Sequence, residues 1–279
     1  MPAPTIRIFS DLHFLESACR ARKMEQLHPL LDGADELISN GDLIDTQNAD
    51  RGHAVTRELK TYFSAHAPTI FLTGNHDPDI SETHELLLAN DGIWITHGDI
   101  LYDEMVPWSR EIPEIRRRLK RAWANMPVQA QRELGTRLRT FRQICHSLPR
   151  PHDPCKSGLI SSLTRYFSVV IPPRCAVRLL HTWATMSRHA ARVAREHRAT
   201  ARFIVFGHTH LPGVWRRADR VVINTGSFCG PLSAQAVDLQ GEELRLRPIE
   251  FRRGEFRLLA PTKTFALPAP VLSPLHSKT

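Results

Sequence analysis

The stretch FIVFGHTH, residues 203–210, places two histidines one residue apart directly after four large apolar residues. A short run rich in Ile, Val and Phe is typical of a buried β-strand. Gly207 and the two histidines then lie in the loop after the strand, and loops held by a rigid scaffold often carry a protein's chemistry. A single His-x-His pair is more often part of a hydrogen-bonded loop than a metal site, so its role depends on what the other loops contain.

Four earlier segments repeat this pattern of an apolar run followed by a polar loop. The runs are residues 5–9, 36–38, 69–72 and 93–95. Oxygen and nitrogen donors lie just beyond the five predicted strands, and they are Asp11, His13, Asp42, Asn75, His97, His208 and His210. Such a set suits two divalent cations with three or four protein ligands each, one carboxylate being shared. Thiolates are absent from it, which favours manganese, iron, zinc or magnesium over a purely structural zinc.

These loops also follow a characteristic motif order. They read D-x-H at 11–13, GD at 41–42, GNHD at 74–77, HGD at 97–99 and GHTH at 207–210. In this order they resemble the calcineurin-like metallophosphoesterase family. The resemblance implies an α/β fold, a four-layer αββα sandwich, with a dinuclear metal site at one end of its two sheets.

The resemblance further implies a role for each residue of the site. One ion would be bound by Asp11, His13, His210 and a shared Asp42, and the other by Asp42, Asn75, His97 and His208. A hydroxide that bridges the ions would attack a phosphate ester or diphosphate bond. His76 would act as general acid or charge stabiliser at the leaving-group oxygen, while Asp77 and Asp99 would orient imidazoles. The protein would thus be a hydrolase with two divalent ions, manganese being the first expectation and iron, zinc or magnesium the alternatives.

Positive charge is concentrated in one part of the chain. Residues 110–200 carry 19 Lys and Arg residues against 5 Asp and Glu residues, a net charge of +14 within a chain whose formal net charge is +8. Apolar residues recur there at helical spacing over 112–123, 134–148 and 174–195. We therefore expect residues 103–199 to form an inserted basic helical cap, and residues 1–102 and 200–259 to form a discontinuous metallophosphoesterase domain. The proline-rich residues 260–279 are expected to be a disordered tail.

Weaker patterns predict the remaining elements. Residues 18–31 and 54–63 have enough helical spacing to connect strands. Short β-type runs at 221–223, 236–239 and 243–246 suggest a second sheet.

The last helix of the insert carries a basic stripe beside an apolar one. The arginines of the basic stripe are Arg174, Arg178, Arg188, Arg192 and Arg195. A basic stripe is often only a solvated face, but arginine suits bidentate phosphate recognition, and a phosphate site is expected nearby. We therefore interpret these arginines as binding residues for an anionic phosphorylated substrate.

Three alternatives for function stay open. The helical cap resembles that of the bacterial UDP-2,3-diacylglucosamine hydrolases, which implies a lipid-sugar diphosphate substrate and peripheral contact of the cap with membrane or lipid. Those enzymes usually carry Arg where this chain has His76. Arginine clusters also bind nucleic acid, which would make the protein a nuclease, although no reader motif is visible. A non-catalytic binding scaffold on the same fold is the third alternative, and the complete ligand set argues against it.

The cysteines and the start of the sequence favour a cytoplasmic protein. The five cysteines are scattered and form no C-x-x-C pair, so neither a disulfide framework nor a cysteine zinc site is indicated. The first residues lack the features of a signal peptide, and no apolar run is long enough to span a membrane.

Overall fold

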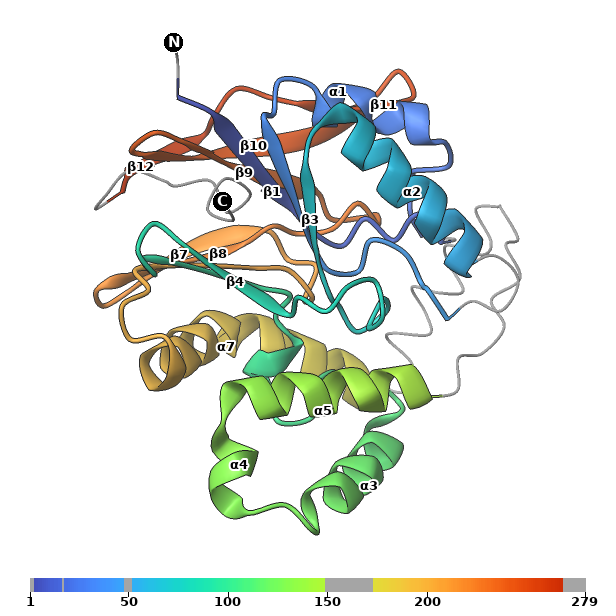
Figure 1. Ribbon diagram of the computed structural model, residues 1–279, viewed down its shortest axis with the longest axis vertical. Coiled ribbons are helices and arrows are strands. Elements are labelled where there is room, and N and C mark those ends of the chain that lie inside the picture. The colour runs from blue at the N-terminus through green and yellow to red at the C-terminus, as the bar shows by residue number, and fades with distance from the viewer. Residues whose placement is uncertain (1–2, 17, 48–51, 149–172, 268–279) are drawn as a thin grey trace.

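Two β-sheets packed face to face form the centre of the protein, and helices cover their outer faces (Figure 1). The computed structural model describes residues 3–16, 18–47, 52–148 and 173–267. The predicted α/β class, with two sheets between helical layers, is confirmed.

The first sheet is built from both ends of the described chain. Its order is β11-β10-β9-β1-β2-β3, with β12 also pairing with β10. The strands are β1 (Thr5–Phe9), β2 (Glu36–Asn40), β3 (Thr69–Leu72), β9 (Ala234–Gln240), β10 (Glu243–Arg252), β11 (Glu255–Leu258) and β12 (Lys263–Ala266). β1, β2 and β3 are parallel, while β9 pairs antiparallel with β1.

The second sheet has the order β4-β5-β6-β8-β7. Its strands are β4 (Glu85–Leu88), β5 (Ile93–Thr96), β6 (Phe203–Phe206), β7 (Gly213–Arg217) and β8 (Arg220–Asn224). The three inner strands are parallel. The predicted second sheet is present, but of the three late runs only 221–223, in β8, belongs to it. β8 extends the sheet of β6, whereas β9 and β10 return to the first sheet because β9 pairs with β1.

The interface between the sheets is mainly aliphatic, with one buried polar contact where Asn40 of β2 donates to the Thr96 carbonyl of β5 at 2.9 Å. It includes Ile6 and Ile8 of β1, Ile95 of β5 and Val205 of β6, all almost completely buried. Helices cover the other face of the inner strands, which is why β6 reads as a continuous apolar run. β1 also carries the buried Arg7, whose Nε lies 2.8 Å from Asp238 of β9.

Short helices and one long helix cover the outer face of the first sheet. They are η1 (Met24–Leu27), α1 (His28–Leu31) and α2 (Gly52–His66). Leu59 and Phe63 of α2 pack with Phe9 and Leu37 in one core cluster. The helix predicted over residues 18–31 begins only at Met24, as η1 followed by α1, because Cys19 forms an isolated antiparallel β-bridge with Cys229 and holds the chain extended before it.

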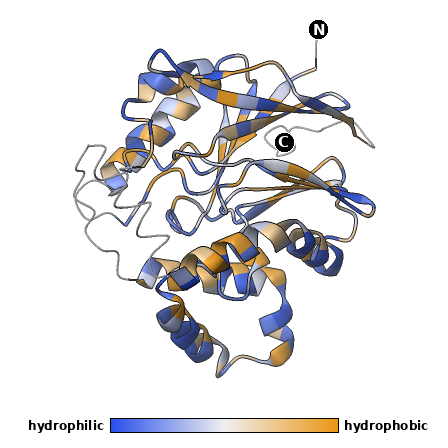
Figure 2. Ribbon diagram, turned by 180° about the vertical axis from the view of Figure 1, so that it is seen from behind, coloured by the Kyte–Doolittle hydropathy of each residue, from blue (hydrophilic) through white to orange (hydrophobic). Residues whose placement is uncertain are grey.

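The inserted segment contributes the remaining helices. They are η2 (Asp99–Leu101), α3 (Ile112–Trp123), α4 (Val128–Arg132), α5 (Leu134–Ser147) and α7 (Pro173–His197). α7 lies against β6, β7 and β8, where Met186 and Ala190 pack with Ile204 and Val222. Figure 2 shows hydrophobic residues in the helices that face the second sheet, and hydrophilic residues dominate α3. α7 is therefore the fourth layer of the sandwich as well as part of the insert.

The segment expected to be a disordered tail begins with ordered structure. Lys263–Ala266 form β12, which pairs antiparallel with residues Glu243–Leu246 of β10. The Phe265 ring contacts the Phe203 ring, with centroids 5.9 Å apart. Residues 268–279 lie outside the described residues. Within the described ranges, none of the helices combines the length and the apolarity that a membrane crossing requires.

Candidate metal centre

The seven predicted ligands follow five different strands and are brought together at one edge of the sandwich. Two follow β1, one each follows β2, β3 and β5, and two follow β6. Because β1–β3 are parallel and β5 and β6 are parallel, their carboxyl ends meet at shared edges. The loops after these strands therefore converge on one place.

Asp11, His13 and His210 form the first donor group. The Nε2 atoms of His13 and His210 are 3.1 Å apart, and Asp11 Oδ1 lies 3.3 Å from His210 Nε2 and 3.8 Å from His13 Nε2. Ligands that each lie about 2.0–2.2 Å from one cation are separated from each other by about 3–4 Å. The spacing therefore fits a single cation held by the three side chains.

The second donor group contains Asp42, His97 and His208, with Asn75 beside them. His97 Nε2 is 3.3 Å from Asp42 Oδ2 and 3.1 Å from Asn75 Oδ1. His208 Nε2 donates a hydrogen bond to the Met105 carbonyl, 2.8 Å away, which leaves Nδ1 as the nitrogen that can bind a metal. A backbone carbonyl that fixes the tautomer is a common arrangement behind metal-binding histidines.

The Asp42 carboxylate lies between the two groups. Its Oδ2 atom is 3.3 Å from His97 Nε2 in one group and 3.8 Å from His13 Nε2 in the other. Its Oδ1 atom accepts a hydrogen bond from the backbone N–H of His76 at 2.8 Å. One carboxylate oxygen is thus placed within reach of both groups, and the other is held by the backbone.

The backbone at the ligands is held in an unusual conformation. Positive φ angles occur at five ligand positions, namely Asp11 (53°), His13 (48°), Asp42 (53°), His208 (65°) and His210 (60°). Residues other than glycine seldom adopt this region, and each such residue costs roughly 1–3 kcal/mol. The surrounding fold therefore imposes a local strain that turns these side chains toward one another.

Two glycines allow the ligand loops to approach closely. A Cβ atom at Gly74 would overlap the side chain and backbone of Asp42, and one at Gly207 would overlap the side chains of Asp11 and Ser10. Neither glycine has a positive φ. Their role is therefore close packing between neighbouring loops rather than turn geometry.

Electrostatics at the site are those of buried carboxylates balanced by imidazoles. Burial raises the pKa of Asp42, but the charges of His97 and His76 outweigh burial and hold that pKa well below its usual range. Burial lowers the pKa of His97, yet the Asp42 carboxylate raises it to about 10. Burial and the neighbouring His97 lower the pKa of His208 to about 4. Divalent cations suit such a set, because they can replace imidazole protons as partners of the carboxylates.

Glu16 is a site residue that the sequence analysis missed. Its Oε1 atom lies 2.7 Å from His13 Nδ1 and 3.6 Å from His76 Nδ1. The carboxylate therefore fixes the His13 ring so that Nε2 faces Asp11 and His210, and it also lies beside His76. The three-residue spacing between His13 and Glu16 was the available signal.

Asp77 and Asp99 contact other groups than the imidazoles they were expected to orient. Asp77 accepts hydrogen bonds from the backbone N–H groups of Asp42, Leu43 and Gly74, at 2.9, 2.7 and 2.7 Å, and so joins two ligand loops. Asp99 instead pairs with Arg142 of α5, whose Nη2 atom lies 2.6 and 2.7 Å from the two carboxylate oxygens. Both members of this pair are buried.

We expect Arg142→Met to destabilise the protein by about 3–5 kcal/mol, because it leaves the Asp99 carboxylate buried without its partner. Denaturant unfolding monitored by circular dichroism measures the change. Arg139→Met, an exposed arginine on the same helix, is the matched control and should change stability by less than about 0.5 kcal/mol. Equal effects of the two substitutions would contradict the structural role of the pair.

Comparison with known protein families agrees with this geometry. The family model described as calcineurin-like phosphoesterase matches residues 4–212, which include all seven candidate ligands and His76. The chain belongs to the calcineurin-like phosphoesterase family. Among curated proteins, none matches the sequence of this chain.

Solved structures similar to this calcineurin-like phosphoesterase are distant in sequence. Chaetomium thermophilum Vps29 is 12% identical with a TM-score of 0.48, and the alignment covers 95% of this chain and 100% of that chain. A dimetal phosphatase from Danio rerio is 12% identical (TM-score 0.43, 93% and 99% covered). The Escherichia coli phosphoesterase Yfce is 16% identical (TM-score 0.40, 94% and 99% covered). Membership of the family rests on the family match rather than on these similarities.

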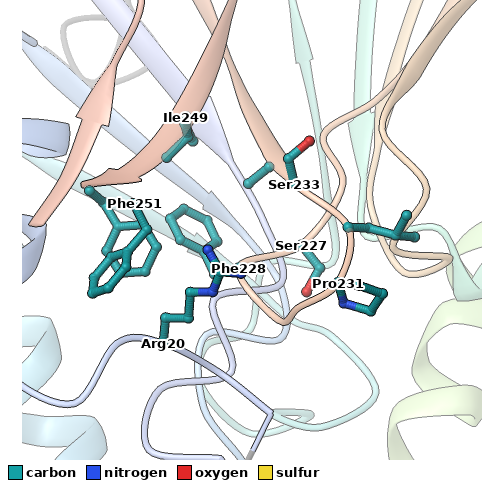
Figure 3. A pocket seen from close by; sticks show the side chains of 10 residues that line it. Arg20, Ser227, Phe228, Pro231, Ser233, Ile249 and Phe251 are labelled. Atoms are coloured by element: carbon teal, nitrogen blue, oxygen red, sulfur yellow. The ribbon is translucent and has the colours of Figure 1, made fainter. Parts of the chain in front are cut away.

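A cavity of about 110 Å³ lies near the site without including its ligands. Figure 3 shows Arg20, Phe228, Pro231 and Phe251 around it. The loop that contains Phe228 separates the cavity from Asp11, since the Phe228 N–H donates to the Asp11 carbonyl at 3.1 Å. None of the seven candidate ligands lines this cavity.

Proposed function

We propose that the protein is a metal-dependent phosphoesterase that hydrolyses a phosphate ester or diphosphate bond. The observation that carries the proposal is the placement of Asp42 Oδ2 between two groups of metal donors. A shared carboxylate is the hallmark of a site for two cations rather than one.

The donor chemistry fits divalent cations. Asp11, His13, His210 and Asp42 would hold one ion, and Asp42, Asn75, His97 and His208 the other. When bound, such ions lower the pKa of water and neutralise charge on phosphoryl oxygens. Oxygen and imidazole ligands without thiolate suit manganese, which we propose first, ahead of iron, zinc or magnesium.

Side chains around the ions would supply proton transfer and would orient the ligands. His76 lies beside His13, with ring centroids 4.9 Å apart, and is partly open to solvent. We assign it the transfer of a proton to the leaving-group oxygen, or stabilisation of charge there. Glu16 and the Met105 carbonyl orient His13 and His208.

The decisive experiment compares three substrate classes. Protein reconstituted with Mn²⁺ and depleted protein are assayed with a phosphomonoester, a phosphodiester and a nucleotide-sugar diphosphate. Hydrolysis that depends on the metal supports the proposal and identifies the class. A protein that binds metal but hydrolyses none of the three would instead be a binding scaffold.

One observation favours a lipid-sugar diphosphate as the second candidate substrate. Val177 and Leu180 of α7 are 65% and 60% exposed, and they alternate with the exposed Arg174 and Arg178. Apolar side chains flanked by arginines suit the surface of an anionic lipid layer. Met186 is fully buried against the second sheet, so it is not available to an acyl chain.

The five arginines of α7 lie on both sides of Trp183, the residue of this helix that contacts the GHTH loop. The Trp183 Nε1–H donates to the Thr209 carbonyl at 2.8 Å, between His208 and His210. The end of α7 leads into the start of β6, so residues before Trp183 extend past the site and residues after it lead away. At 1.5 Å per residue, Arg178 and Arg174 lie about 7 and 13 Å along the helix toward the site end, whereas Arg188 and Arg192 lie about 7 and 13 Å the other way, alongside the sheet.

We therefore propose that Arg174 and Arg178 contribute most to substrate binding, and that Arg188, Arg192 and Arg195 contribute less. Arg178→Ala should raise KM for an extended anionic substrate by about 5- to 20-fold and leave turnover of p-nitrophenyl phosphate unchanged, because charge-assisted hydrogen bonds are worth roughly 1–2 kcal/mol. Steady-state kinetics measures both. Arg192→Ala is the matched control, and an equal rise in KM for both variants would assign the whole stripe to binding.

The four described cysteines are free thiols, as a reducing compartment would maintain them, and we propose a cytoplasmic location. Fractionation of cells that produce the protein tests this. Recovery with membranes would favour the lipid substrate instead.

A further inference from the structure

We infer that Trp108 is a stacking platform for a planar ring on the group that the substrate retains after hydrolysis, such as a nucleobase. The inference deepens the proposed function and rests on it. A planar ring is a feature of the substrate that neither the metal ligands nor the arginines of α7 would recognise.

Trp108 lies directly beside a candidate metal ligand. Its ring centroid is 5.1 Å from that of His208, and the rings are tilted by 47°. Tyr102 meets the Trp108 ring edge-on, at 6.4 Å and 84°, and itself stacks on His189 of α7 at 5.7 Å. Trp108 is therefore held between the GHTH loop and Tyr102, which is itself packed on α7, rather than projecting freely from the surface.

The backbone that carries Trp108 is also tied to the site. The Met105 carbonyl accepts the hydrogen bond from His208 Nε2, and Met105 is completely buried. Residues 102–108 thus hold the orientation of one ligand and place an indole next to it. A platform with a fixed position relative to the ions can orient a substrate, whereas a mobile side chain could not.

Part of the Trp108 indole surface and its N–H donor are available to contact a substrate. The side chain is only half-buried, and Nε1 has no hydrogen-bond partner among the residues that the structure describes. By contrast, the Nε1–H of Trp94 donates to Glu85 and that of Trp183 donates to the Thr209 carbonyl. Trp94 and Trp183 serve the fold, while the half-buried indole of Trp108 lies beside His208 with its N–H group left for a ligand.

The position of Trp108 indicates which part of the substrate it contacts. His76, assigned to the leaving group, lies against His13 in the first donor group. Trp108 lies against His208 in the second donor group. A phosphoryl group between the two ions would therefore direct its leaving group toward His76 and its retained group toward Trp108. Flat unsaturated rings stack on indole regardless of their hydrogen-bonding edges.

Two diesters with the same leaving group test the inference. The p-nitrophenyl ester of thymidine 5′-phosphate and methyl p-nitrophenyl phosphate differ only in the retained group. We expect the wild type to hydrolyse the thymidine ester with a kcat/KM about 10-fold or more above that of the methyl ester, because stacking of one base contributes a factor of roughly 5–100. Trp108→Ala should bring the ratio close to one by acting on the thymidine ester alone, and Trp108→Phe should retain part of it.

Trp123→Ala, a half-buried tryptophan at the end of α3, is the matched control and should leave the ratio unchanged. Equal hydrolysis of both diesters by the wild type, or equal losses for both in Trp108→Ala, would overturn the platform while leaving the phosphoesterase intact. Failure of every variant to hydrolyse either diester would instead count against the proposed function. In that case, calorimetric binding of thymidine 5′-monophosphate to the wild type and to Trp108→Ala tests the platform separately. The platform requires binding that is at least about fivefold weaker in the variant.

Discussion

Asp42→Asn is expected to lower kcat/KM by about 10⁴-fold or more and to lose bound metal at the same time. Nucleophile activation and charge neutralisation each contribute several kcal/mol and both depend on the ions that Asp42 is placed to share. The substitution keeps the size of the side chain and an oxygen that can accept the His76 N–H. Asp42 lies at a loop end and belongs to none of the three hydrophobic core clusters, so the melting temperature should change little. Elemental analysis, kinetics and thermal unfolding on the same preparation measure the three effects.

Asp103→Asn is the control for Asp42→Asn. Its side chain is 90% exposed, and it should leave metal content and kcat/KM unchanged. Full occupancy of two metal sites in Asp42→Asn would show that Asp42 does not bridge them. Loss of activity together with loss of the folded state would assign Asp42 to the fold instead.

His76→Ala is expected to retain the metal and to lower kcat by about 10²–10⁴-fold for substrates with poor leaving groups. The ligands stay in place because His76 contacts Asp42 through its backbone N–H, which alanine preserves. Substrates with acidic leaving groups need little protonation and should lose much less. A series of aryl phosphates of increasing leaving-group pKa measures the dependence.

The control for His76→Ala is His53→Ala, an imidazole whose side chain is 75% exposed. It should follow the wild type across the whole series. A loss in His76→Ala that is the same for every leaving group would assign His76 to positioning rather than proton transfer. Loss of metal from His76→Ala would place it among the ligands.

The sequence predicted the strands that are buried on both faces. The inner strands β1 and β6 begin and end at the predicted residues, because short runs rich in Ile and Phe have few alternatives to a central strand. The bounds of β3 were also predicted, although it is the edge strand of the first sheet. β4, β7, β11 and β12 were missed. They are half-exposed, and β12 is paired only with β10, so their sequences carry little periodicity.

The convergence of the seven ligands could be predicted from their positions after strands, because parallel strands bring their carboxyl ends to the same edge. The groups that orient these ligands were harder to predict from the sequence. Met105 acts through its backbone carbonyl, which leaves no residue-type signal. Arg142 reaches Asp99 across 43 residues, and its contact depends on how α5 packs against η2. Glu16 alone could have been found from local spacing.

α7 has a consequence for how cap segments can be exchanged between relatives. Cutting at residues 103 and 199 would remove the helix that covers β6, β7 and β8 and expose Ile204 and Val222 to water. A chimera made that way would aggregate through the uncovered sheet. The portable unit is the shorter piece that carries α3 and α4, and it must end before Leu134 so that the recipient keeps its own outer helix and the arginine of α5 that pairs with Asp99. The positions at which a segment of this protein can be exchanged are therefore determined by how helices pack on the sheets rather than by where the sequence motifs end.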